Sequence, residues 1–254
     1  MKVQLNSPII SKLISYPKLD IYEYHKRLID LAKIGVEDAI LEGPTKLYEL
    51  NILGKGHSGI VLKVTACSKK TMALKIRRVD SRRKDSLTEV YNQKFANLEG
   101  IGPQIIDHTN DLILMELITG KGIYDWLQDP TTFHLVTSTN IINIVTEILE
   151  QCYRLDVLHL DHGELTRIDN HVMVSENNQI SLIDFESAST KRKPCNVTSA
   201  SQALLLSRGS ISKKICKFID LKDPEFLLNC LKKYKKRKNR QNFEDILSLV
   251  NGNR

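Results

Sequence analysis

Polar and hydrophobic residues alternate along much of the first half of this chain, which is typical of strands whose side chains point to two faces of a sheet. The pattern predicts three strands, at 47–53, 60–66 and 71–76. Two more are expected at 103–107 and 111–117. The last is nearly continuous in apolar residues, so it should be a buried central strand.

Apolar residues at helical spacing dominate the second half and also mark residues 87–98 in the first half. Ser86 can cap that helix, and Glu89 completes a capping-box pattern. The other expected helices cover 123–128, 137–157, 198–206, 210–219, 224–234 and 243–249. Two short strands, 171–174 and 179–183, lie among them. Glycines at 120 and 122 predict a hinge between two domains at 119–122.

Residues 1–46 precede the first predicted strand, and residues 21–32 have apolar positions at roughly helical spacing. Gly35 suits the end of this helix, and Gly43-Pro44 closes the segment. We expect a helical extension packed on the following domain. A pair of DNA-binding helices is the alternative, although no dense basic face is visible in this segment.

The length of 254 residues allows one large or two small domains. The hydrophobic content of 41% is enough for a buried core. The formal net charge of +7 indicates a polyanionic partner, but much of the excess is local. It lies in the run 232–240 and in a smaller cluster within 77–84. The run is either a solvated helix end or a platform for RNA, a ribosomal particle or an acidic protein. Tyr234 is its single aromatic residue, so base stacking is not indicated.

Five cysteines form no C-x-x-C pair and no zinc-ligand spacing. An odd number of cysteines without a secretory signal is typical of reduced thiols in the cytosol. No window approaches the roughly 18 consecutive apolar residues that span a bilayer. We therefore expect a soluble, cytoplasmic protein with no membrane partner.

One stretch carries three glycines in a short turn, Gly54-Lys55-Gly56-His57-Ser58-Gly59, with Val61 shortly after. Glycines here let backbone N–H groups approach a phosphate chain with no Cβ in the way. The Gly-x-Gly-x-x-Gly pattern alone is weak evidence, and a dinucleotide site would require a helix directly after it. A predicted strand follows instead. We therefore expect a hairpin lid.

Lys75 lies among apolar residues of the strand 71–76, where a charged side chain needs a reason. One reason is an edge position from which the side chain extends to water. One strand after a glycine lid, Lys75 is also a candidate ligand for nucleotide phosphates. Glu89 then has two interpretations, the capping box or an ion pair that holds Lys75. Glu99 is the weaker rival for that pair.

Two acidic loops flank the predicted hairpin of residues 171–183. His162-Gly163-Glu164-Leu165 precedes it, and Asp184-Phe185-Glu186 follows it. Carboxylates that face a glycine lid and a lysine suit a metal–phosphate site, because hard cations such as Mg²⁺ prefer oxygen ligands.

With these motifs, the chain resembles the protein-kinase superfamily on its small atypical branch. It is similar to the RIO kinases, to the small archaeal kinase partnered with the tRNA-threonylcarbamoylation complex, and above all to compact Ser/Thr kinases predicted in archaea. The resemblance covers about residues 48–190. The matching segments are Gly54-x-Gly56-x-x-Gly59-x-Val61 for the lid, Ala73-Leu74-Lys75, Met115-Glu116 for the hinge approach, His162-Gly163-Glu164-Leu165 for the catalytic loop and Ile183-Asp184-Phe185 for the metal loop. Five matches in the right order are a strong indication.

The resemblance implies an α+β, two-lobed protein-kinase-like fold. It would have a helical N-terminal extension (1–46), an antiparallel-sheet N-lobe (47–119) and a small, mainly helical C-lobe with a basic C-terminal segment (120–254). ATP would lie under the lid with its adenine against the backbone of 116–118. The implied ATP-binding residues are Gly54, Lys55, Gly56, Gly59, Val61, Ala73, Lys75, Glu89, Glu116, Leu117 and Ile118.

The implied catalytic residues are Glu164, Lys75 and Asp184. Glu164 occupies the catalytic-base position, where the family usually has aspartate. The extra methylene displaces the carboxylate, and a misplacement of ~1 Å can cost about a hundredfold in rate. Since glutamate has a similar reference pKa, a slow kinase is favoured over an inactive one. Asp161 is a substitute base.

Asp184 would bind Mg²⁺, or Mn²⁺ in its place. For the second metal ligand Asn170 is preferred and Asp169 is the alternative. His171 could also align there, although a lone histidine is more often structural. Glu186 replaces the glycine of the family motif, which predicts a stiffer loop that does not flip.

The resulting hypothesis is an ATP- and Mg²⁺-dependent Ser/Thr protein kinase that phosphorylates itself or a protein partner. No Ala-Pro-Glu follows Asp184, and residues 190–194 form only a short basic loop. Two rivals stay open. One is a small-molecule phosphotransferase, because enzymes of that kind share the His-Gly-Asp loop of the protein-kinase family. The other is a nucleotide-binding pseudokinase or ATPase that acts as a switch in an RNA- or ribosome-related assembly.

Overall fold

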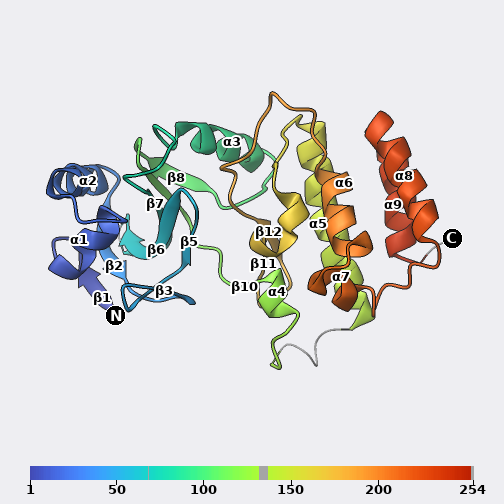
Figure 1. Cartoon of the computed structure of the whole chain (residues 1–254), viewed down its shortest axis with the longest axis horizontal. Coiled ribbons are helices and arrows are strands. Elements are labelled where there is room, and N and C mark those ends of the chain that lie inside the picture. The colour runs from blue at the N-terminus through green and yellow to red at the C-terminus, as the bar shows by residue number, and fades with distance from the viewer. Residues whose placement is uncertain (68, 132–136, 253–254) are drawn as a thin grey trace. The chain divides into compact units, whose positions relative to one another are not determined.

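The computed structural model describes residues 1–67, 69–131 and 137–252, and the chain forms two compact units (Figure 1). The first unit comprises Met1–Asn97 with Pro103–Ile118. The second comprises Leu98–Gly102 and the chain from Thr119 onward. The chain is an α+β protein, and its named strands pair in antiparallel fashion.

The first unit is built on a seven-stranded sheet. Its strands are β1 Lys2–Gln4, β2 Val36–Ile40, β5 Gly54–Lys55, β6 Gly59–Ala66, β7 Lys70–Arg77, β8 Ile105–His108 and β9 Leu112–Glu116. Six of them follow the order β1, β2, β6, β7, β9, β8, and β5 pairs with β6. Strand β9 is buried along Leu112, Ile113 and Leu114, as its apolar run predicted.

Residues 47–53 do not form the single strand that was predicted. Two short strands, β3 (Thr45–Leu47) and β4 (Leu50–Ile52), form a separate two-stranded hairpin. Tyr48 and Glu49 make its turn, with φ of 49° and 61°. Such left-handed backbone ends a strand, but neither residue is one of the usual turn formers, so the pattern did not reveal it.

Residues 1–46 are only partly helical. The helices α1 (Pro8–Ile14) and α2 (Ile21–Lys33) lie there, but β1 and β2 belong to the sheet, and β2 pairs with β6. The helices add fully buried residues, Ile10, Leu13 and Leu31, to the core of this unit. The segment is therefore an integral part of the first unit, and the expectation of a purely helical extension is wrong.

Asp111, in the turn between β8 and β9, connects α2 to the sheet. Its carboxylate accepts hydrogen bonds from Nε of Arg77 (2.6 Å) and Nζ of Lys26 (3.1 Å). The fully buried Arg27 lies 3.9 Å from the same carboxylate. Burial by itself would raise the pKa of Asp111, but the hydrogen bonds from Arg77 and Lys26 hold it below its ordinary value.

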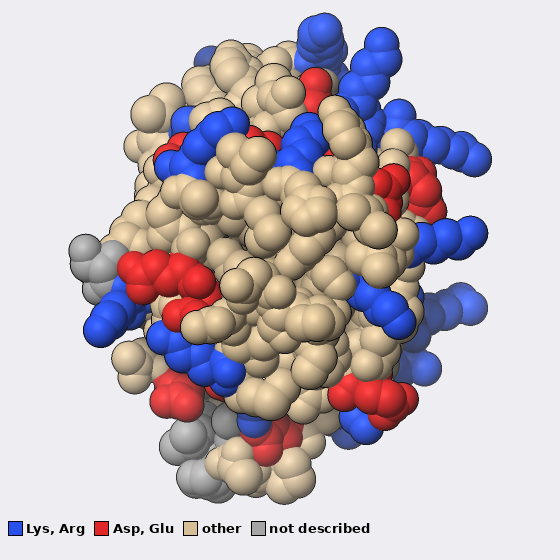
Figure 2. All heavy atoms as spheres, turned by 90° about the vertical axis from the view of Figure 1, so that its left-hand side faces the viewer, with Lys and Arg blue, Asp and Glu red and all other residues tan. Residues whose placement is uncertain are grey.

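Figure 2 shows the side of the molecule on which α1 and α2 lie, and neutral side chains cover the middle of this face. Large hydrophobic side chains exposed on these elements and next to them are Ile9, Leu19, Ile21, Tyr22 and Ile29. A DNA-binding helix pair would instead present a basic surface to the phosphate backbone. The face therefore gives that alternative no support.

The second unit is mainly helical and carries a three-stranded sheet in the order β10, β11, β12. The strands are β10 Lys121–Gly122, β11 Val172–Val174 and β12 Ile180–Leu182. The helices are α4 Ile123–Trp126, α5 Ser138–Val157, α6 Asn196–Ser201, α7 Ser210–Ile215, α8 Pro224–Lys236 and α9 Arg240–Val250, with a 3₁₀ helix η2 Leu165–Asn170 and a π-helical turn η3 Gln202–Leu206. Within the described ranges, no helix has both the length and the apolar character needed to cross a membrane.

Candidate functional site

The glycine stretch forms a tight turn between two paired strands of the first unit. Strand β5 pairs with β6 so that Gly54 lies opposite Val61. The N–H of Gly56 donates to the carbonyl of Gly59 (2.8 Å), which closes the turn. A strand follows the glycines as predicted, but the strand before the turn is β5, inside the glycine stretch, and not residues 47–53.

The three glycines of this turn have different surroundings. A Cβ on Gly59 would lie 2.6 Å from the carbonyl oxygen of Ile76, so packing itself requires glycine there. A Cβ on Gly54 would meet no atom within 4 Å, and a Cβ on Gly56 would meet only the carbonyl of Gly59 at 3.6 Å. Packing therefore does not explain why glycine occupies positions 54 and 56. Close approach of a ligand to the backbone would explain it.

Lys75 is on a central strand, because β7 lies between β6 and β9. The interpretation of an edge lysine is therefore wrong. Its Nζ lies 2.6 Å from Oε1 of Glu89 on helix α3 (Leu87–Asn97), and the two side chains are only 12% and 8% exposed. The positive charge of Lys75 and the negative charge of Glu89 compensate each other. Loss of either partner would leave the other charge buried without this counter-charge, which is strongly destabilising.

The start of α3 differs from the predicted capping box. Oδ1 of Asp85 accepts the N–H of Leu87 (3.1 Å). Ser86 takes part through its backbone N–H, which donates to the carbonyl of Asn110 (2.8 Å). The carboxylate of Glu89 is directed to Lys75, so the ion-pair interpretation describes this residue.

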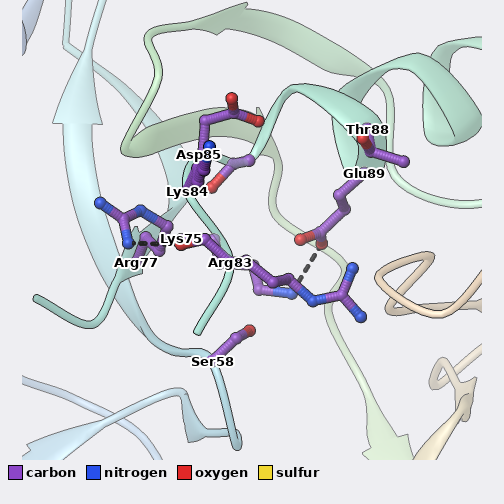
Figure 3. A pocket seen from close by; sticks show the side chains of 9 residues that line it. Ser58, Lys75, Arg77, Arg83, Lys84, Asp85, Thr88 and Glu89 are labelled. Carbon is purple, nitrogen blue, oxygen red and sulfur yellow. Dashed lines mark hydrogen bonds and ion pairs between the residues drawn. The ribbon is translucent and has the colours of Figure 1, made fainter. Parts of the chain in front are cut away.

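A pocket of about 320 Å³ lies beside the Lys75–Glu89 pair, within the first unit (Figure 3). Ser58, from the glycine turn, lines one part of it. Its basic side chains are Lys75, Arg77, Arg83 and Lys84, and its acidic ones are Asp85 and Glu89. A concave site with an excess of positive charge suits an anion such as a phosphate group.

The expected adenine-binding positions lie at one end of β7 and β9. Met72 pairs with Glu116, so Ala73 and Glu116 are close along the two strands. Ala73 is 5% exposed. Glu116 is exposed, and Leu117 and Ile118, which follow the strand, are half-buried. Half-buried apolar side chains therefore lie next to the backbone at the end of β9.

In the second unit, three neighbours hold the carboxylate of Glu164. Its Oε1 accepts the hydroxyl of Ser187 (2.6 Å), and its Oε2 lies 3.1 Å from the guanidinium of Arg167 and 2.9 Å from Nε2 of His171. The hydrogen bond from Ser187, above all, lowers the pKa of Glu164. A carboxylate with a lowered pKa and two engaged oxygens is a weaker proton acceptor.

Buried hydrogen bonds fix the loop before Glu164. Oδ1 of Asn196 accepts the N–H of His162 (2.9 Å), and its Nδ2 donates to the carbonyl of Leu160 (2.8 Å). Asp156 of α5 accepts both the backbone N–H and Nδ2 of Asn196 (2.9 Å each), and the hydroxyl of Tyr234 on α8 donates to it (2.9 Å). We call Asp156, Asn196 and Tyr234 the loop clamp. Sequence patterns could not reveal it, because its members come from three distant helices.

Asp161, the alternative to Glu164 as catalytic base, is engaged by hydrogen bonds within the protein. It is 5% exposed, and its Oδ2 accepts Nε of Arg192 (2.9 Å) while Oδ1 accepts the N–H of Cys195 (3.1 Å). A carboxylate engaged in this way has little capacity to take a proton from a substrate.

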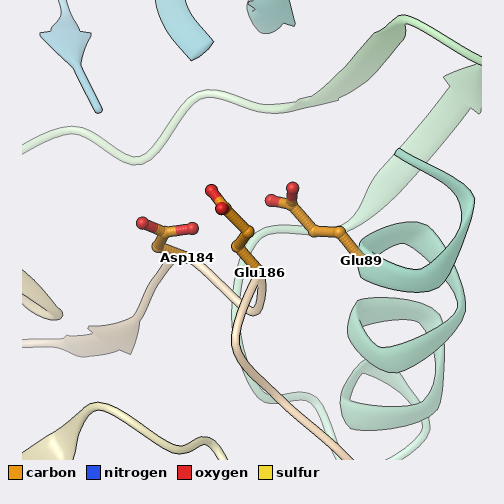
Figure 4. Close-up of side chains that lie close together, drawn as sticks. All are labelled: Glu89, Asp184 and Glu186. Atoms are coloured by element: carbon orange, nitrogen blue, oxygen red, sulfur yellow. The ribbon is translucent and has the colours of Figure 1, made fainter. Parts of the chain in front are cut away.

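Asp184 and Glu186 project from the loop after β12 (Figure 4). Asp184 has φ of 67°, a backbone conformation that is sparse for residues other than glycine. One carboxylate oxygen of Asp184 and one of Glu186 lie within 4.8 Å of each other. Paired carboxylates are the ligands that Mg²⁺ and Mn²⁺ prefer. Glu186 was expected only as a replacement for glycine, although its spacing of two residues from Asp184 indicated a second carboxylate in the same loop.

Phe185, which lies between Asp184 and Glu186 in the sequence, is fully buried and packs against Gly102 and His162. Its ring centroid lies 5.0 Å from that of His162, and a Cβ on Gly102 would lie 2.7 Å from its Cε2. Burial, with a smaller contribution from His171, lowers the pKa of His162 to about 4. Moving a buried phenyl ring out of such a site costs roughly 3–5 kcal/mol by analogy with truncations. The predicted stiffness of this loop stays a prediction.

The candidates for the second metal ligand, Asn170 and Asp169, end η2, and both are exposed. His171 follows them and is buried, with Nδ1 3.4 Å from the carbonyl of Ile183 in addition to its contact with Glu164. His171 therefore has a structural role here. Asn170 and Asp169 stay the candidates.

The basic run 232–240 covers the end of α8 and the start of α9. Its exposed lysines on α8 are Lys232, Lys233, Lys235 and Lys236. Tyr234 is fully buried, so the run offers no aromatic ring for base stacking. Arg240 is bound by the carboxylate of Glu150 through two contacts of 2.8 Å, which raise its pKa. An anionic partner would therefore meet mainly the lysines of α8.

The chain matches no protein-family model and no curated protein.

Proposed function

We propose that this protein is an ATP- and Mg²⁺-dependent Ser/Thr protein kinase with a two-lobed kinase-like fold, the first unit serving as N-lobe and the second as C-lobe. The observation that carries the proposal is the Lys75–Glu89 ion pair beside a cation-rich pocket, one strand away from the glycine turn. A lysine fixed in this way, next to glycine backbone open to a ligand, suits the phosphates of a nucleotide.

In this proposal Lys75 binds nucleotide phosphates and the backbone around Gly54 and Gly56 covers them. Asp184 and Glu186 would hold Mg²⁺, with Asn170 or Asp169 as a further ligand, and the ion would neutralise charge on the phosphates. Glu164 orients the acceptor hydroxyl and takes its proton as the hydroxyl oxygen bonds to the γ-phosphorus. The bond from the γ-phosphorus to the β–γ bridging oxygen breaks, and ADP leaves with that electron pair.

A nucleotide-binding switch without phosphoryl transfer is the second candidate function, and one observation favours it. Ser187, Arg167 and His171 already engage the carboxylate of Glu164. In such a switch the nucleotide would be bound, and the lysines of α8 would serve an RNA or acidic partner.

Transfer of ³²P from γ-labelled ATP separates these functions. The full chain would be incubated with Mg²⁺ and either mixed protein substrates or a panel of sugars and amino alcohols, next to E164A and D184A. The kinase proposal predicts label in the chain or in proteins, and its loss in D184A. Label in small molecules alone would indicate a small-molecule phosphotransferase. Nucleotide binding with no label in any acceptor would leave only the switch.

A further inference from the structure

Two basic side chains that have no role in the proposed function reach the pocket beside Lys75 from one loop. This loop, residues 78–86, connects β7 to α3 and brings Arg83 and Lys84 to the pocket wall (Figure 3). Hydrogen bonds hold the second half of this loop in position. Nη1 of Arg77 donates to the carbonyl of Arg83 (2.9 Å), and the N–H of Ser86 donates to the carbonyl of Asn110 (2.8 Å).

The pocket has more positive charge than its own acidic residues balance. Glu89 is paired with Lys75, and Asp111, outside the pocket, is paired with Arg77. Asp85 accepts a backbone N–H at the start of α3. Among residues 1–67, 69–131 and 137–252, no carboxylate forms an ion pair with Lys84.

We propose that Arg83 and Lys84 bind the terminal phosphoryl group of the nucleotide whose other phosphates Lys75 holds. The inference rests on the proposed function, because it requires a nucleotide at Lys75. A terminal phosphoryl group carries close to two negative charges at neutral pH. The planar guanidinium of Arg83 can bind two of its oxygens at once, and Lys84 adds a compact charge. ATP is then preferred over ADP, because only ATP places a phosphoryl group in this pocket.

Ser58 and Thr88 line the same pocket and carry hydroxyl groups. Each hydroxyl can donate one hydrogen bond to a phosphate oxygen. The pocket therefore combines charge with short-range donors, which is the composition of a phosphate subsite and not of a general basic surface.

Binding of ATP, ADP and inorganic phosphate by the full chain, measured by calorimetry with Mg²⁺, tests the inference. The variants are R83A, K84A and R83A/K84A, with R82A as matched control, because Arg82 is in the same loop and is not part of the pocket wall. We expect the double variant to weaken ATP about tenfold or more and ADP less than about twofold, since only the terminal phosphate loses charge-assisted bonds. R82A should bind both like the parent. Melting temperatures would show that each variant is folded.

Equal effects of the double variant on ATP and ADP, or no effect on either, would overturn the inference. So would loss of inorganic phosphate binding with unchanged ATP affinity, because the pocket would then take a different anion. Failure of the proposed function looks different. In that case the parent chain and K75M would both bind no nucleotide, whatever stands at positions 83 and 84.

Discussion

The hydroxyl of Tyr234 donates a hydrogen bond of 2.9 Å to the carboxylate of Asp156, which joins helix α8 to helix α5 inside the second unit. Asp156 in turn holds Asn196, whose side chain binds backbone on both sides of Asp161. The C-terminal helices therefore help to position the loop that carries Glu164. The loop clamp explains how a small, mainly helical unit can hold the loop of Glu164 in place.

Replacing Tyr234 with phenylalanine should destabilise the second unit. The buried carboxylate of Asp156 would lose a hydrogen-bond donor, and such a loss costs about 1–3 kcal/mol. Urea unfolding measures the difference. Y153F is the matched control, because Tyr153 belongs to the same aromatic cluster and no described residue accepts its hydroxyl. Equal stability of Y234F and the parent chain would show that the bond contributes nothing.

Replacing Asn196 with alanine should loosen residues 160–162 without unfolding the unit. The N–H of His162 and the carbonyl of Leu160 would lose their partner, so the amide of His162 should exchange with deuterium at least about tenfold faster. Hydrogen exchange of peptides from this loop measures the effect. N229A, an exposed position on α8, is the control. Unchanged protection of His162 would contradict the role of the loop clamp.

Asp111 should make the stability of the first unit depend on pH. Its folded pKa lies below the ordinary value of ~3.9, so its contribution is fully present above that value and is lost as pH falls through the folded pKa. D111N should cost roughly 3–5 kcal/mol at pH 7, because Arg77 and Arg27 would lose a buried counter-charge. Denaturant unfolding at several pH values measures this.

The difference between D111N and the parent chain should shrink as the pH falls from about 4 through the folded pKa of Asp111, because the stabilising charge is lost over that range. D107N, in the same β8–β9 region and exposed, is the control and should follow the parent. A difference that persists unchanged at pH 2 would mean that the lost stability does not come from the charge.

Alanine substitutions at Gly59 and Gly54 should have different effects, the first on stability and the second on ATP binding. G59A should be strongly destabilised, because its Cβ would lie 2.6 Å from the carbonyl oxygen of Ile76. G54A should fold normally, since no atom lies within 4 Å of the added Cβ, yet it should bind ATP more weakly if phosphates approach that backbone. Melting temperature and ATP affinity of the two variants measure this. Normal ATP affinity in G54A would argue against the lid.

The sequence predicted those parts of the fold that depend on local patterns. Strands β6, β7 and β9 and helices α3 and α5 follow from alternation or helical spacing. The contact between Lys75 and Glu89 could be proposed because both residues lie in recognisable motifs on adjacent elements. Its alternative, a capping box, could be decided only by the structure, because Asp85 lies equally close to the start of α3.

Long-range pairing could not be predicted from these patterns. The addition of β1 and β2 to the sheet depends on partners far away in the chain. The loop clamp likewise joins Asp156 to Tyr234, and a buried polar residue within a helical pattern gives no indication of its partner. The turn at Tyr48 was missed because left-handed backbone is rare for tyrosine.

The proposed function depends on two residues, Lys75 for binding the phosphates of ATP and Asp184 for binding Mg²⁺. The most direct test is the affinity for ATP of the parent chain, K75M and D184N, each measured with Mg²⁺ and with EDTA. The account predicts that K75M weakens ATP at least about tenfold in both conditions, and that D184N removes the gain from Mg²⁺ while leaving metal-free binding unchanged. Full Mg²⁺ enhancement in D184N, or parental ATP affinity in K75M, would contradict it.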